Sequence, residues 1–138
     1  MKKLVSFIIL CSALLASIQW RTDFDTAYQE SLQADKPLFV FIERRHPPCR
    51  WCEKMKHTTL SDANISNYIN SRFIPVKLEK HTSIYPEELY PKYVPAIYII
   101  VGDKVIKSII GYWDTSDFSS DLADVERYLQ KESNTSKE

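Results

Sequence analysis

Cys49 and Cys52 are the residues with the clearest capacity for chemistry in this sequence. Two cysteines separated by two residues bring their sulfurs within bonding reach when the second lies one helical turn after the first. At a helix start, unpaired backbone N–H groups and the positive end of the helix dipole stabilise a thiolate, and Arg50, Lys54 and Lys56 add positive charge nearby. The pattern predicts thiol-disulfide exchange, in which Cys49 attacks and Cys52 resolves the mixed disulfide.

The first 18 residues have the composition of a targeting segment. Lys2 and Lys3 form a basic start, and an apolar stretch without charge follows over residues 4–18. Ala16 is the best small residue before a cleavage point, so we expect cleavage after about residue 16, with an uncleaved anchor as the alternative. The segment predicts a periplasmic or secreted protein with a bacterial-type signal peptide.

Removal of that segment takes Cys11 with it and leaves only Cys49 and Cys52 in the mature chain. A secreted domain stapled by disulfides would spread several cysteines along the sequence, whereas this pair closes a loop too small to stabilise much. The pair is therefore predicted to be catalytic and not structural.

Composition limits the other functions. At 138 residues and 44% apolar content, the chain suits one domain, expected over residues 19–132 and followed by a polar tail at 133–138. The 18 basic and 18 acidic residues balance, which gives no reason to expect nucleic acid as a partner. Only two glycines argue against a phosphate-binding loop, and we expect no cofactor and no metal. The expected partner is a disulfide-containing protein or a small thiol.

Apolar periodicity places the cysteine pair between a strand and a helix. Helix-like spacing of Phe24, Ala27, Tyr28 and Leu32 precedes a continuous apolar run that is typical of a strand buried on both faces. The expected order is helix 22–34, strand 38–42, loop 44–48, helices 50–60 and 62–69, strand 73–78, a hairpin of strands 96–101 and 104–110, and a helix capped by Ser116 or Asp117.

This order, the cysteine motif and the Val94-Pro95 pair resemble the thioredoxin family, especially its exported single-domain members, from Trp20 to about Leu129. The resemblance implies an α/β, thioredoxin-like fold with a central mixed sheet of about four core strands flanked by helices. It also implies that Pro95 is a cis-proline beside the cysteines and that the backbone at Val94 pairs with substrate. Trp51 is expected to contact substrate as well.

Two departures from the family pattern concern residues that tune the cysteines. Arg50-Trp51 replaces the usual Gly-Pro between them, so thioredoxin's redox potential does not carry over. The family also keeps a buried acid with a partner lysine behind the second cysteine, and Lys77 falls on the matching strand. Glu43 is the acid by its position before Cys49, whereas alignment of the apolar residues puts Phe41 there if the loop 44–48 is longer.

Other functions of a Cys-X-X-Cys motif remain open. His46 and His57 flank the pair and could complete a zinc site, although their spacing is wrong for a zinc finger. A non-catalytic partner-binding module is the third reading. Within the redox reading, a reductase supplied by a membrane electron donor is favoured, because dedicated oxidases of this fold usually carry an inserted helical domain. An oxidase or isomerase is the alternative direction.

Overall fold

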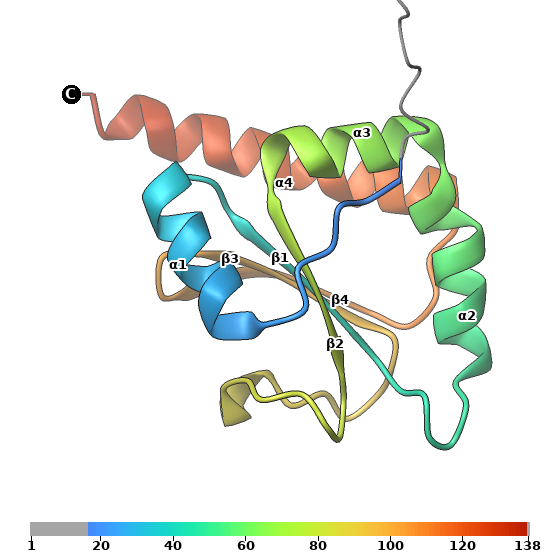
Figure 1. Ribbon diagram of the computed structural model, residues 1–138. Coiled ribbons are helices and arrows are strands. Elements are labelled where there is room, and N and C mark those ends of the chain that lie inside the picture. The colour runs from blue at the N-terminus through green and yellow to red at the C-terminus, as the bar shows by residue number, and fades with distance from the viewer. Residues whose placement is uncertain (1–16, 138) are drawn as a thin grey trace, which may run out of the picture.

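The computed structural model describes residues 17–137, and nearly all of the predicted targeting segment lies outside these residues. Figure 1 shows helices arranged around one sheet. In chain order the elements are α1 (Phe24–Ala34), β1 (Leu38–Glu43), α2 (Arg50–His57), α3 (Ala63–Arg72), β2 (Ile74–Glu79), β3 (Ala96–Val101), β4 (Lys104–Ile110) and α4 (Thr115–Thr135), with 3-10 turns at Thr59–Ser61 and Glu87–Leu89.

The four strands form one mixed sheet in the order β2-β1-β3-β4. β1 runs parallel to β2 and antiparallel to β3, and β3 and β4 form the expected antiparallel hairpin. A parallel neighbour requires a crossover, which α2 and α3 provide. The expected fold class, a thioredoxin-like α/β fold with a mixed sheet flanked by helices, is confirmed.

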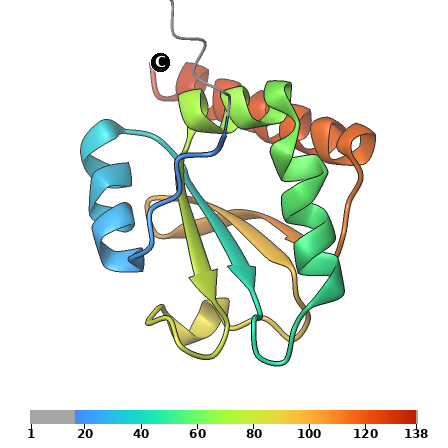
Figure 2. The ribbon, with the colours of Figure 1, turned by 45° about the vertical axis from the view of Figure 1, so that its right-hand side comes forward.

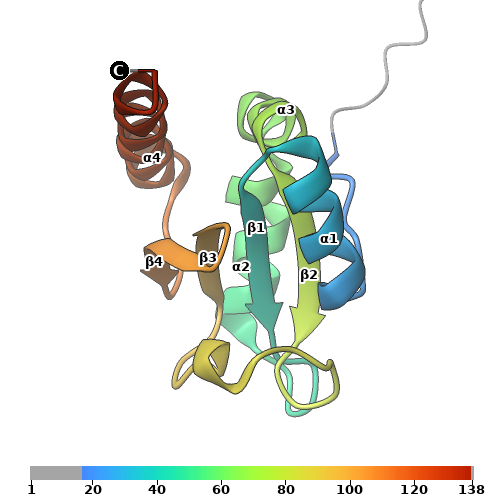
Figure 3. The same ribbon diagram turned by 90° about the vertical axis from the view of Figure 1, so that its left-hand side faces the viewer.

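β1 is the centre of the core, and all six of its residues are buried. Leu38, Val40 and Ile42 pack with α1, whereas Phe39 and Phe41 pack with α2, α3 and α4. Figure 3 shows the strands between α1 and α4. A strand with helices on both faces needs apolar residues at every position, which explains the unbroken apolar run.

Residues 17–21 lie along the outer edge of β2. The backbone of Arg21 accepts a hydrogen bond from Lys77 N–H and donates one to the Pro75 carbonyl, both at 2.9 Å. Ile18 is buried, so it belongs to the folded domain although the sequence interpretation placed it in the targeting segment. Within residues 17–137, no helix combines the length and apolar character that a membrane crossing requires.

Three details of the helices differ from the sequence expectation. α2 ends at His57, where the chain tightens into a 3-10 turn. α4 is capped by Asp114, whose carboxylate accepts from Asp117 N–H, and not by Ser116 or Asp117. α4 also continues to Thr135 into the predicted tail, where the hydroxyls of Thr135 and Ser136 donate to the carbonyls of Lys131 and Glu132.

Leu32 is another difference, because 46% of it is exposed whereas Ser31 beside it is buried. The hydroxyl of Ser31 donates to the Lys36 carbonyl at 2.6 Å, so this polar group is satisfied inside the fold. The helix therefore turns a small hydrogen-bonded residue inward where periodicity suggested leucine.

We expect Phe39→Ala to lower the free energy of unfolding by about 3–5 kcal/mol, since it leaves a cavity in a closed core. The Phe39 ring is fully buried, and its centroid lies 5.8 Å from that of Phe73 and 6.4 Å from that of Phe118. Urea denaturation measures the change. Leu32→Ala is the matched control and should change stability by no more than about 0.5 kcal/mol. Equal losses in the two variants would contradict this placement of the core.

Candidate active site at the cysteine pair

Cys49 and Cys52 form a disulfide at the start of α2, with their Cα atoms 5.2 Å apart. Figure 2 shows the chain leaving the carboxyl end of β1, turning through a loop and entering α2. Cys49 is the N-cap residue of this helix, and its sulfur accepts a hydrogen bond from Cys52 N–H at 3.1 Å. The motif therefore lies at a strand-to-helix junction, where a helix N-terminus stabilises negative charge on sulfur.

The two cysteines differ in their access to solvent. Cys49 is 6% exposed and Cys52 is fully buried. An incoming disulfide reaches only a sulfur with open surface, so the geometry distinguishes an outer from an inner sulfur.

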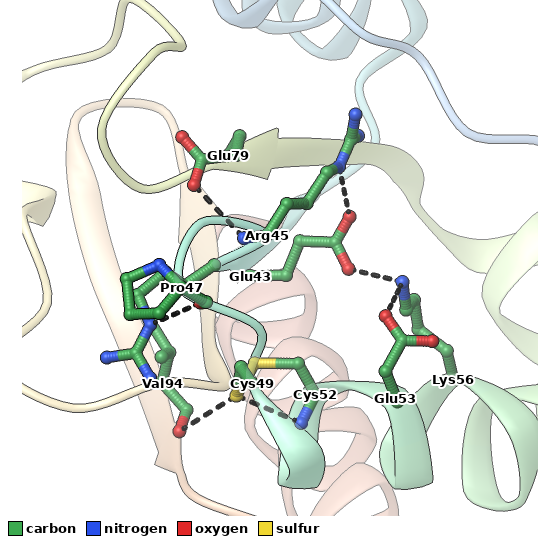
Figure 4. The surroundings of a disulfide bond; sticks show 10 residues. Glu43, Arg45, Pro47, Cys49, Cys52, Glu53, Lys56, Glu79 and Val94 are labelled. Carbon is green, nitrogen blue, oxygen red and sulfur yellow. Dashed lines mark hydrogen bonds and ion pairs between the residues drawn. A yellow bond between two sulfur atoms is a disulfide. The ribbon is translucent and has the colours of Figure 1, made fainter.

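The Val94-Pro95 pair brings a backbone carbonyl beside the outer sulfur. The Val94-Pro95 peptide bond is cis, as the resemblance implied. The Val94 carbonyl oxygen lies 3.8 Å from Cys49 Sγ (Figure 4). The Pro95 carbonyl accepts a hydrogen bond from Gly111 N–H at 2.8 Å, which holds this loop to the end of β4. The backbone beside the disulfide is thus anchored to the end of β4.

Glu79 fixes the loop that precedes the disulfide, a role that the sequence interpretation missed. One of its carboxylate oxygens accepts from Arg45 N–H at 3.2 Å, and the other accepts from the backbone N–H groups of His81 and Thr82 at 2.7 and 2.8 Å. Burial opposes the charge of Glu79, but these hydrogen bonds outweigh burial and lower its pKa to about 2. Glu79 therefore joins the loop after β1 to the turn after β2.

Glu43 lies directly across from Glu79 in the parallel register and is 1% exposed. Its carboxylate contacts Lys56 Nζ at 2.6 Å and Arg45 Nε at 3.0 Å, and in Figure 4 it is directed toward these cations and away from the disulfide. Lys56 also contacts Glu53 at 2.7 Å. Burial opposes the charge of Lys56, but its bonds to the two glutamates outweigh burial and raise its pKa.

The expected pairing of Glu43 with Lys77 is wrong. Lys77 lies opposite Phe41 in the register of β1 and β2, so the apolar alignment was the better guide to that strand position. The Lys77 ammonium lies 5.9 Å from the centroid of the Trp20 ring. Glu43 does not meet Lys77 because the loop 44–48 is long enough to put Phe41, and not Glu43, opposite Lys77. Glu43 then ends β1, where Lys56 on α2 is its partner.

Trp51 is 46% exposed and packs beside Tyr112, with ring centroids 5.9 Å apart. The Lys54 ammonium lies 5.4 Å from the Trp51 centroid and 4.6 Å from that of Tyr112, and the Arg50 guanidinium lies 5.2 Å from that of Trp51. Tyr112 is not among the site residues predicted from the sequence. Its place next to Gly111, which follows the last strand, is the signal that puts it at the site.

His46 and His57 do not gather around the cysteines. His57 Nε2 lies 3.2 Å from a Glu53 carboxylate oxygen, and His46 is exposed in the loop. Both cysteine sulfurs are engaged in the disulfide. Across residues 17–137, no group of three or more His, Cys, Asp or Glu side chains has an arrangement that could hold a metal ion.

A family model described as "Thioredox_DsbH: Protein of unknown function, DUF255" matches residues 6–102, which include β1, the cysteine pair, the cis-proline and β3. The chain belongs to this family. The Thioredox_DsbH match and the cysteine disulfide together support a thiol-disulfide redox protein at the general level. No curated protein sequence matches the chain.

Solved structures agree on the fold of this Thioredox_DsbH member. A structure described as a DsbH oxidoreductase superposes with a TM-score of 0.61 at 18% identity, covering 83% of this chain and 85% of the other. A solution structure of a thioredoxin from Thermus thermophilus gives 0.67 at 19% identity, covering 79% and 87%. Thioredoxin f from spinach chloroplast gives 0.55 at 17% identity, covering 83% and 88%. At these identities the likeness establishes the fold.

We expect Glu79→Gln to destabilise the protein at neutral pH. We also expect the free energy of unfolding of this variant to fall less than that of wild type as the pH is lowered. Because the folded pKa of Glu79, about 2, is below its ordinary value of 4.5, its contribution is present above pH 4.5 and is lost as the pH falls toward 2. At about 1.4 kcal/mol per pKa unit, that contribution is up to about 3 kcal/mol. Denaturation between pH 7 and 2 measures it, with Glu88→Gln on an exposed turn as the control. If the stability of Glu79→Gln fell in acid as steeply as that of wild type, the role of Glu79 in holding these loops would be contradicted.

Proposed function

We propose that this protein is an exported thiol-disulfide oxidoreductase that reduces disulfides through the Cys49–Cys52 couple. The observation that carries the proposal is the asymmetry of the two sulfurs at a helix N-terminus, where Cys49 is 6% exposed and Cys52 fully buried. An outer nucleophile with an inner resolving partner is the arrangement that exchange through a mixed disulfide requires. The family membership supports the same class of chemistry.

In the reductive direction the first step is attack by the Cys49 thiolate on one sulfur of a substrate disulfide. A bond forms between Cys49 Sγ and that sulfur, the substrate bond breaks, and the departing thiolate takes up a proton. The N–H of Cys52, which donates to Cys49 Sγ at 3.1 Å, stabilises the thiolate before attack. Arg50 adds positive charge at the next position.

The second step releases the substrate. Cys52 loses its proton and attacks Cys49 Sγ, which forms the internal disulfide and breaks the bond to the substrate; the second substrate sulfur leaves as a thiolate and then takes up a proton. Two electrons and two protons pass in total from the protein dithiol to the substrate. The disulfide that the structure contains is the product of this step.

Substrate backbone is held at Val94 and Pro95 in this proposal. The Val94 carbonyl lies beside the reactive sulfur and is an acceptor for a substrate N–H, while the cis-peptide sets its direction. The exposed face of Trp51 is a contact for substrate side chains on the other side of the disulfide.

The location and the electron supply are also proposals. The basic start and apolar stretch of residues 1–18 support export to the periplasm or beyond, where a reductase needs a donor that renews its dithiol. A membrane electron donor is the partner proposed for that step, and a protein disulfide is the substrate.

Single substitutions distinguish the roles of the two cysteines. Cys52→Ser should accumulate a mixed disulfide with a substrate protein, because Cys49 attacks and nothing resolves the complex. Cys49→Ser should accumulate none, because Cys52 is buried. Free thiols are blocked with an alkylating agent, and mass spectrometry then measures the mixed disulfide in each variant. Accumulation in Cys49→Ser alone would reverse the assignment.

The second prediction concerns direction. We expect the mature protein, equilibrated in glutathione buffers, to have a reduction potential near or below about −230 mV, as a reductase does. A value near about −120 mV would make it an oxidant. The absence of a reversible couple, together with stoichiometric zinc in the purified protein, would contradict the redox proposal as a whole.

A further inference from the structure

Positive charge without a carboxylate partner surrounds the disulfide. Arg50, Lys54 and Lys92 are exposed, and no ion pair within residues 17–137 includes any of them. Two other cations of the same region, Arg45 and Lys56, differ because both are paired with Glu43. The unpaired charges are thus available to a partner, whereas the paired ones are engaged within the protein.

Aromatic rings hold these outer cations in place. On the α2 side, Lys54 lies over both Trp51 and Tyr112, and Arg50 lies over Trp51. Cation–π contact restrains a charged group but does not neutralise it, in contrast to an ion pair. The charges on this side therefore have a defined position and remain uncompensated.

The other side of the disulfide repeats this arrangement on a different element. The Lys92 ammonium lies 5.3 Å from the centroid of the Tyr93 ring, and Tyr93 is 61% exposed. Tyr93 directly precedes Val94, whose carbonyl faces Cys49 Sγ at 3.8 Å. Restrained cations therefore flank the reactive sulfur from both α2 and the cis-proline loop.

The acids nearest to Arg50 and Lys54 in the chain and around Tyr112 have partners other than these cations. Glu53 on α2 contacts Lys56 and His57, and Asp114 accepts from Asp117 N–H at the start of α4. The exposed Glu87 and Glu88 lie in the 3-10 turn Glu87–Leu89, away from α2 (Figure 1) but in the same loop as Lys92. Within residues 17–137, none of these acids forms an ion pair with Arg50, Lys54 or Lys92.

We propose that the substrate is a polypeptide whose reactive cysteine is flanked by acidic residues on both sides. This inference rests on the proposed function and adds the substrate class. Acidic side chains would pair with the cationic rim, defined as Arg50, Lys54 and Lys92 with the rings of Trp51, Tyr93 and Tyr112. An extended segment fits because the cations lie on two separate elements on either side of the sulfur, and the exposed rings contact the apolar parts of its side chains.

The test compares three peptide disulfides that differ only in the two residues flanking cysteine, which are Asp, Asn or Lys. The reduced protein is mixed with each, and the rate of thiol release is measured at low and high salt. We expect the acidic peptide to react fastest, and its advantage to shrink as salt rises from about 0.1 M to about 1 M, where the screening length falls from about 10 Å to about 3 Å.

Charge reversal identifies the residues responsible. Lys54→Glu and Lys92→Glu should each lower the rate with the acidic peptide by about tenfold relative to wild type and raise the rate with the basic peptide. Comparing each variant with wild type on the same peptide cancels the intrinsic reactivity of that peptide. Lys104→Glu is the matched control, because Lys104 also lies over a tyrosine ring but follows the far end of β3.

Hydroxyethyl disulfide, a neutral small substrate, separates docking from activation of Cys49. An unchanged rate with this reagent in Lys92→Glu, beside an altered preference among the peptides, supports the proposal. An equal loss on every substrate in Lys92→Glu shows that this lysine acts on the thiolate and overturns the proposal, as does a wild-type protein without preference for acidic flanks. Failure to reduce even hydroxyethyl disulfide would refute the proposed function itself, and the inference with it.

Discussion

Both faces of β1 are buried, so the strand can expose chemistry only where it ends. Its carboxyl end leads through the exposed loop 44–48 into α2, and this places Cys49 at the N-terminus of that helix. The core residues Phe39 and Phe41 pack against the same helices that carry the cysteines and their cations. The position of the outer sulfur is therefore a consequence of core packing as much as of the local sequence.

Charge around the site is arranged in two layers with different roles. In the inner layer, Glu43 and Glu79 end adjacent strands; Glu43 forms ion pairs with Lys56 and Arg45, and Glu79 accepts from backbone N–H groups and the Thr82 hydroxyl. A buried carboxylate without such partners would be costly, so these bonds are needed for the loops to close as they do. In the outer layer, aromatic rings hold cations that have no acid. The inner charges shape the site and the outer charges face a partner.

The sequence predicted the parts of the fold that depend on local patterns. The buried strand, the hairpin at Gly102 and the cysteine motif at a helix start follow from periodicity, turn residues and spacing. The cis state of Pro95 came from resemblance alone. The predicted pairing of Glu43 with Lys77 was wrong because it depended on strand register. The lysine partner of Glu43 is decided by the length of the loop 44–48 and by which residues face each other across β1 and β2.

Glu79 shows why contacts between distant segments escape this kind of reasoning. In the sequence it is only an acid after an apolar run, and its partners are backbone groups at Arg45, His81 and Thr82. Backbone donors carry no signal in residue types. Glu43 and Glu79 each end one of two adjacent parallel strands, which is a reason to expect them side by side. This reason can be used only once the strand pairing is known.

The path of residues 17–21 has a geometric consequence for how the domain would work on a tether. The Ser17 carbonyl accepts from the side chain of Asn70 on α3, and Figure 1 shows this point at the opposite end of the fold from the start of α2. A chain attached ahead of Ser17 would therefore leave the domain on the side away from the disulfide. If the preceding segment stayed in a membrane, the reactive face would point outward, toward substrates approaching from the bulk phase.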